Sequence, residues 1–82
     1  MLDTKQLLTV AHSFAELRRL KLSTVSSLAL QDGKRLAALE DGADITTGRC
    51  RRTMQWFSDN WPDGPWPDEV PRPEPSLVGG RA

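Results

Sequence analysis

A chain of 82 residues, of which 38% are hydrophobic, can build one small domain but is too short for a large enzyme cleft. Its formal net charge of zero excludes a coat protein that binds nucleic acid by bulk positive charge. One cysteine and one histidine exclude an intramolecular disulfide and a zinc site of ordinary ligand count. No signal peptide or membrane-spanning segment is recognisable, so we expect a soluble cytoplasmic protein.

The charges are nevertheless segregated along the chain. The C-terminal part is rich in acidic residues, which are Asp63, Asp68, Glu69 and Glu74. The body is rich in basic residues, which are Arg18, Arg19, Lys21, Lys34, Arg35, Arg49, Arg51 and Arg52. A balanced total can therefore hide a basic face.

The first predicted helix begins near the N-terminus. Asp3 can act as its N-cap with Gln6 as the capping-box partner, and Leu2 can pack on Leu7 as a hydrophobic staple. Apolar residues at three- and four-residue intervals predict the face that packs on a core, and they are Leu7, Val10, Ala11, Phe14, Leu17 and Leu20.

Two short helices are predicted next. Ser23 can cap the first, which we expect to run to about Ala29, and Asp32 can cap the second through its carboxylate. Gly42 supplies the left-handed residue that ends the second helix. The inward residues of the first are expected to be Val25, Leu28 and Ala29.

A fourth helix is predicted to begin at Thr46 or Thr47 and to stop at Pro62. Its apolar side is formed by Cys50, Met54, Phe57 and Trp61. The Pro-rich composition beyond it excludes a regular helix or a central strand. We therefore expect an all-α fold, with a four-helix domain over residues 1–61 and an extended or partly disordered tail over residues 62–82.

The two short central helices lead to the functional hypothesis, because two such helices joined by a tight turn are typical of a helix-turn-helix DNA reader. Lys34 and Arg35 fall in the first turn of the second helix, where the helix dipole disfavours cations. They are either part of an ordinary solvated face or held outward to meet an anion. The second interpretation predicts contacts to bases in a major groove from Gln31, Asp32, Lys34, Arg35 and Ala38.

Basic residues also gather at the start of the fourth helix. A helix N-terminus with free N–H groups binds phosphate, and nearby arginines strengthen such binding. Local ion pairing with Asp41 and Asp44 is the alternative explanation for part of this cluster. The phosphate hypothesis assigns contacts to Ser23, Thr24, Arg49, Arg51 and Arg52.

Three tryptophans follow this cluster. Trp56 lies off the apolar side of the fourth helix, so it contributes to a dimer interface with Trp61 and Trp66, is covered by the Pro-rich tail, or both. Cys50 is expected to be a buried small hydrophobe and His12 a surface residue. The carboxylates form no acid/base pair, so we expect no enzyme activity, no metal and no cofactor.

The span from Ser23 to Gly42, with Leu39-Glu40-Asp41-Gly42 at its end, resembles the lambda-repressor/Cro-type (XRE-like) helix-turn-helix family. Residues 32–39, 42–46 and 54–62 look like a narrower group, the short QseC-type controller repressors of plasmids and integrative elements. In this family Ser26 would be the small residue of helix two and Leu36 the buried aliphatic residue of the recognition helix. The usual turn glycine is replaced here by Leu30-Gln31, which shifts the expected helix boundaries.

The resemblance implies a dimeric, operator-binding regulator of a few bacterial promoters, often its own. We expect it to bind double-stranded DNA as a homodimer at a pseudo-palindromic operator, either as a repressor that occludes RNA polymerase or as a regulator that recruits it. No membrane association and no small-molecule ligand are expected. The competing hypothesis is a small helical antiactivator, which would sequester another regulator through Trp56, Trp66 and the Pro-rich tail.

Overall fold

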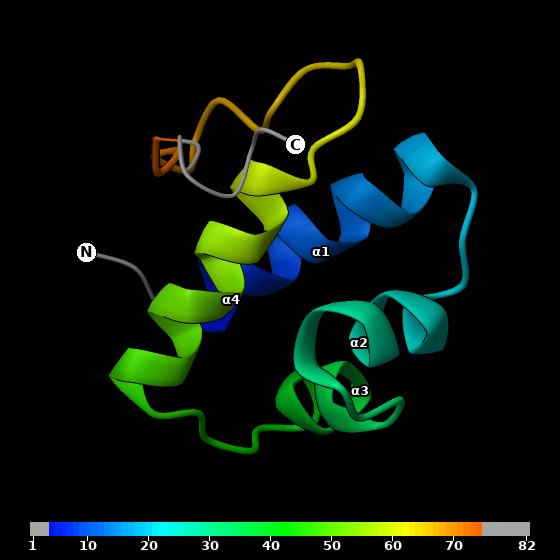
Figure 1. The fold of residues 1–82 in the computed structure, drawn as a ribbon. Helices are drawn as coiled ribbons and strands as arrows, with labels where there is room; N and C mark the ends of the chain where they lie inside the picture. Colours follow the sequence, from blue (N-terminus) through cyan, green and yellow to red (C-terminus); the bar gives the residue numbers. More distant parts are fainter. Residues whose placement is uncertain (1–3, 75–82) are drawn as a thin grey trace.

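The computed structural model describes residues 4–74, and Figure 1 shows the arrangement of the helices. No strand forms in this part of the chain. The long helices α1 and α4 pack against each other, while the shorter α2 and α3 form a second pair that packs mainly on α1. The four helices are α1 (Thr4–Arg18), α2 (Leu22–Leu30), α3 (Arg35–Glu40) and α4 (Thr47–Asp59). The expected all-helical, four-helix fold is therefore confirmed.

The core is formed mainly by one face of α1 and one face of α4, as the hydrophobic periodicity predicts. Phe14 lies at its centre, because its ring makes edge contacts with those of Trp56 and Phe57 at centroid distances of 5.5 and 5.3 Å. Cys50 is buried, as expected. The other buried hydrophobic residues of the two faces are Leu7, Val10, Ala11, Ala15, Met54 and Phe57.

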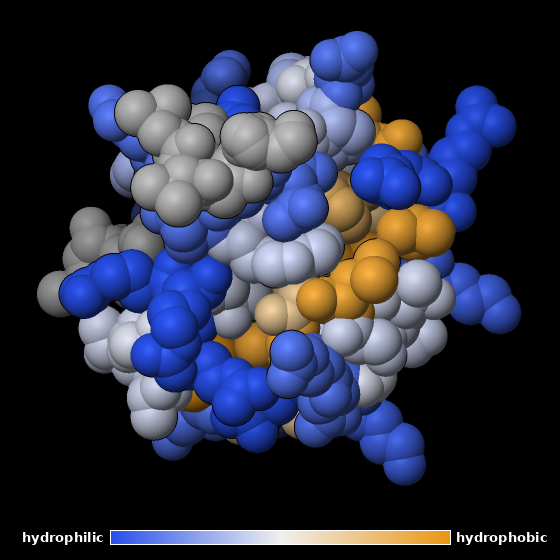
Figure 2. Space-filling view, viewed as in Figure 1, coloured by the Kyte–Doolittle hydropathy of each residue, from blue (hydrophilic) through white to orange (hydrophobic). Residues whose placement is uncertain are grey.

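Two leucines expected in the core are exposed instead. Leu28 is 50% exposed, because the buried side of α2 is centred on Val25 and Ser26 and turns Leu28 to solvent. Leu17 is 37% exposed, because it lies in the last turn of α1, beyond the part that α4 covers. Figure 2 shows a patch of apolar surface among the hydrophilic residues on the face in view.

The first boundary of α2 differs from the prediction. Ser23 does not cap the helix, because α2 begins at Leu22 and its N-cap is Lys21, whose side chain makes no capping hydrogen bond. The half-buried Leu22 packs on the core, and this contact favours the earlier start. The predicted capping of α1 by Asp3 and the Leu2 staple lie outside the described residues.

The predicted boundaries of α3 and α4 agree better with the structure than the predicted start of α2 does. The Asp32 carboxylate accepts a hydrogen bond from the Lys34 N–H at 2.9 Å, but α3 itself begins only at Arg35. Gly42 follows α3 with a φ of 105°, as expected, and the Thr46 hydroxyl caps α4 by accepting from the Arg49 N–H. α4 ends at Asp59, before Pro62.

Residues 61–74, which we call the C-terminal strap, fold back on α1 and α4. Val70 is buried in the same core as the helices, and the Trp66 indole donates a hydrogen bond to its carbonyl at 2.8 Å. The Arg72 guanidinium lies 5.3 Å from the centroid of the Trp66 ring and donates to the Ser58 carbonyl at 2.9 Å. Trp61 contacts Trp66 at a centroid distance of 4.6 Å. These two indoles therefore pack within one chain.

The positive φ of Gly42 leads to a stability prediction. In Gly42→Ala, a Cβ would meet no atom within 4 Å, so the cost comes only from the backbone conformation and should be about 1–2 kcal/mol. Gly48→Ala is the control, because Gly48 lies in α4 with room for a Cβ and should stabilise by about 0.5–1 kcal/mol. Urea unfolding monitored by tryptophan fluorescence measures both, and equal effects would contradict the assignment of strain at Gly42.

Candidate nucleic-acid interface

The buried hydroxyl of Ser26 positions α3 against α2. The Ser26 side chain is completely buried and accepts a hydrogen bond from the Leu36 N–H at 3.0 Å. It also donates a hydrogen bond to the carbonyl of Asp32. One side chain thus holds both the turn and the beginning of α3, with Leu36 fully buried beside it.

The turn between α2 and α3 runs back along α2. Gln31 adopts the left-handed conformation (φ 60°) at the C-cap of α2 and reverses the chain. Gly33 then lies so close to α2 that a Cβ would be 3.1 Å from the Ser27 hydroxyl oxygen. The same Cβ would be 3.7 Å from the Ser23 carbonyl oxygen, so the turn lies beside the first residues of α2. The exposed surface of this region includes Lys34, Ser23 and Thr24. We call this the turn surface.

The two cations expected to point outward have different environments. Lys34 is exposed and has no ion pair with any residue of the described chain. Arg35 is half-buried, and its guanidinium donates a hydrogen bond to the Asp44 carbonyl at 3.0 Å. Its Nε is buried and has no partner within residues 4–74. The expectation of an outward side chain is therefore wrong for Arg35, because the loop after α3 folds over it.

α3 is also tied to α1. The His12 Nε2 lies 2.5 Å from a carboxylate oxygen of Glu40, and both side chains are about half exposed to solvent (52% and 42%). An exposed pair of this kind contributes about 0–1 kcal/mol, so it orients α3 more than it stabilises it. His12 is on the surface, as expected, but the sequence does not indicate this contact.

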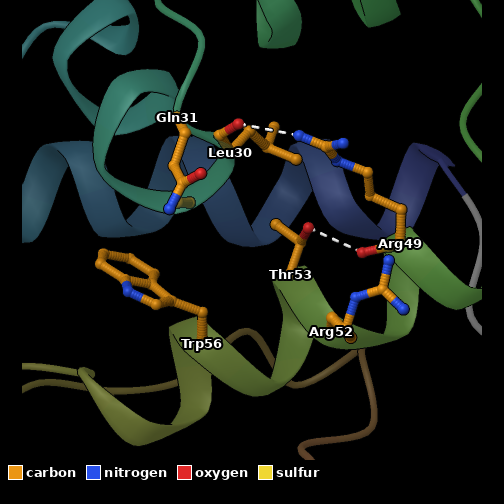
Figure 3. A pocket seen from close by; sticks show the side chains of 7 residues that line it. Leu30, Gln31, Arg49, Arg52, Thr53 and Trp56 are labelled. Carbon is orange, nitrogen blue, oxygen red and sulfur yellow. Dashed lines mark hydrogen bonds between the residues drawn. The ribbon is translucent and has the colours of Figure 1, made fainter.

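The remaining candidates divide between two regions. Ala38 is half-buried, whereas Asp32 and Arg51 are exposed. Gln31, Arg49 and Arg52 line an open groove of about 310 Å³ between the end of α2 and α4, shown in Figure 3. We call it the α2–α4 groove, and its other lining residues are Ala29, Leu30, Thr53 and Trp56.

The structure also bears on the ion-pairing alternative for the arginine cluster. Neither Asp41 nor Asp44 forms an ion pair with an arginine of α4 within residues 4–74. Arg49 instead donates a hydrogen bond to the Leu30 carbonyl at 2.9 Å, across the groove in Figure 3. Arg51 and Arg52 remain exposed.

Comparisons of the chain with protein-family models, with curated proteins and with solved structures found no match. Within residues 4–74, no helix has the length and apolar character that crossing a membrane requires. The same residues contain no cluster of three or more His, Cys, Asp or Glu side chains that could hold a metal ion.

The two hydrogen bonds of Ser26 predict a large effect for a small substitution. Ser26→Ala leaves the Asp32 carbonyl and the Leu36 N–H without this partner and should destabilise the protein by about 1–3 kcal/mol. Ser27→Ala is the matched control, because Ser27 is exposed on the same helix and should change stability by less than about 0.5 kcal/mol. Equal midpoints in urea unfolding would refute the role assigned to Ser26.

Proposed function

We propose that this chain is a sequence-specific regulator of transcription that binds double-stranded DNA. In this proposal α2, the turn at residues 31–34 and α3 act as a helix-turn-helix, with the start of α3 entering the major groove. The support is geometric. A nine-residue helix and a short second helix are joined by a tight turn, and Ser26 fixes their relative position.

The observation that carries the proposal is the environment of Lys34. This cation occupies the N-cap of α3, where the helix dipole is unfavourable to it by about 0.3–1 kcal/mol. The Asp32 carboxylate accepts a hydrogen bond from the Lys34 backbone N–H, but the Lys34 ammonium forms no ion pair within residues 4–74 and is free to bind a DNA phosphate or the acceptor edge of guanine. Asp32 and Gln31 lie two and three residues before Lys34, and in this proposal they supply an acceptor for cytosine and a bidentate partner for adenine.

Contacts to the DNA backbone are proposed for exposed residues around this turn. Ser23 and Thr24 carry exposed hydroxyl groups in the first turn of α2, which has no side-chain cap to occupy its N–H groups. Arg51 is exposed on α4 and has no partner in the described chain. Arg49 and Arg52 line the α2–α4 groove and are not needed for this proposal.

Homodimerisation on a pseudo-palindromic operator belongs to the same proposal. One short recognition helix contacts few base pairs, so two copies one helical turn apart would supply the specificity of a repressor that blocks RNA polymerase. All three tryptophans are half-buried, and Trp56 is the one proposed for the dimer contact. Trp61 and Trp66 are weaker candidates, because they pack on each other within the chain.

Two substitutions distinguish the proposed base contact of Lys34 from the proposed phosphate contact of Arg51. Lys34→Ala should cost about 1–3 kcal/mol on the preferred operator and much less on random DNA, because the contact is to a base. Arg51→Ala should weaken both DNAs alike and reduce the salt slope of binding by about one, because the contact is to a phosphate. Fluorescence anisotropy with the upstream DNA of the gene and a shuffled duplex, at several salt concentrations, measures these differences.

The wild-type protein must first bind that upstream DNA at physiological salt. If it shifts neither duplex and instead copurifies with a regulatory protein, the antiactivator hypothesis replaces the DNA-binding one. If Lys34→Ala lowers the affinity for both duplexes equally, Lys34 does not contact a base.

A further inference from the structure

The α2–α4 groove lies apart from the turn surface and combines two positive charges with an aromatic wall. Arg49 and Arg52 lie toward one end and the indole of Trp56 toward the other, with the Gln31 side chain on the same side as Trp56, as Figure 3 shows. The lining contains no acidic side chain. The groove therefore lacks an anionic partner of its own.

The basic end of the groove is suited to bind a carboxylate. Arg49 is held in place by its hydrogen bond to the Leu30 carbonyl at 2.9 Å. Arg52 is exposed, and its guanidinium makes no hydrogen bond or ion pair within residues 4–74. A guanidinium binds a carboxylate through two parallel hydrogen bonds, so Arg52 offers a complete fork to an incoming acidic side chain.

The other end is rigid and apolar. The Trp56 ring is fixed by edge contacts with Phe14 and Phe57, at centroid distances of 5.5 and 5.3 Å. Ala29 and Leu30 line the groove, and the neighbouring Leu28 is half exposed. A fixed indole beside apolar surface loses little conformational entropy when a partner side chain packs on it.

These features favour a protein segment over other occupants. The groove is open to solvent and near the lower size limit of ligand pockets, so a free small molecule would stay largely hydrated. A DNA backbone presents phosphates but has no apolar side chain to pack against Trp56. Tryptophan and arginine are the residues in which binding energy concentrates at protein–protein interfaces.

We propose that the α2–α4 groove docks an acidic peptide segment of a partner protein. In this segment a carboxylate binds Arg52, with Arg49 nearby, and an adjacent aliphatic side chain packs on Trp56. The Gln31 amide is positioned to donate a hydrogen bond to the peptide backbone. This inference goes beyond the proposed DNA binding and does not rest on Lys34, Ser23 or Thr24. It shares Gln31 with the proposed base contacts and Trp56 with the proposed dimer contact, so a bound peptide would compete with both.

The test is a titration of the isotope-labelled full chain, followed by two-dimensional ¹H–¹⁵N NMR spectroscopy. The probe is the capped tripeptide acetyl-Leu-Glu-Leu-amide, and its neutral analogue acetyl-Leu-Gln-Leu-amide is the ligand control. We expect saturable shifts of the Trp56 indole and Gln31 amide signals at millimolar concentrations with the acidic peptide. The neutral peptide should bind about tenfold more weakly, because it offers no charge to Arg52.

Two charge reversals provide the matched protein variants. Arg52→Glu should weaken binding of the acidic peptide by at least about tenfold. Arg51→Glu makes the same charge change at an exposed neighbouring residue outside the groove lining, and it should leave binding nearly unchanged. Both side chains are exposed, so the folded spectrum should persist in each variant.

Three results would overturn the proposal. They are the absence of a saturable shift, equal binding of the acidic and neutral peptides, and equal losses in the two variants. A further titration of the same labelled chain uses a 16-base-pair DNA duplex in place of the peptide. If the duplex shifts the Trp56 indole signal and the tripeptide does not, the groove contacts nucleic acid instead.

Discussion

The hydroxyl group of Ser26 is the contact on which the rest of the proposed site depends. α3 has only six residues, and a helix of that length is not stable in isolation. It persists because Leu36 and Leu39 are buried and because Ser26 satisfies a carbonyl of the turn and an amide of the helix at once. The position of Lys34 at the start of α3 therefore depends on a polar group inside the core.

Much of the positive charge of this chain is used to hold its own backbone. Arg35, Arg49 and Arg72 donate hydrogen bonds to the carbonyls of Asp44, Leu30 and Ser58, respectively. An arginine suits this role because it carries five donors on a rigid plane. The cations left for an external partner are fewer than the sequence suggests. Among the candidates they are Lys34, Arg51 and Arg52, and they divide between different surfaces.

The C-terminal strap explains how so short a chain closes its core. Val70 adds an apolar side chain to the core, and Trp66 packs between Trp61 and the guanidinium of Arg72. Ser58 and Gln55 of α4 also hydrogen-bond to the carbonyls of Pro73 and Glu74. The strap thus adds Val70 and Trp66 to the apolar and aromatic side chains of the core, while the groove beside Trp56 stays open.

The sequence by itself determined the features whose causes lie within a few residues. The faces of α1 and α4 follow from apolar spacing, and the ends at Thr46 and Gly42 follow from a capping hydroxyl and a residue that tolerates positive φ. Only the tertiary structure decided that Leu28 faces solvent, that Arg35 turns to Asp44 and that Gln31 lines one groove with Arg52 and Trp56. These outcomes depend on which backbone or side chain from a distant part of the sequence packs beside each residue. The spacing of residues along the chain does not specify these contacts.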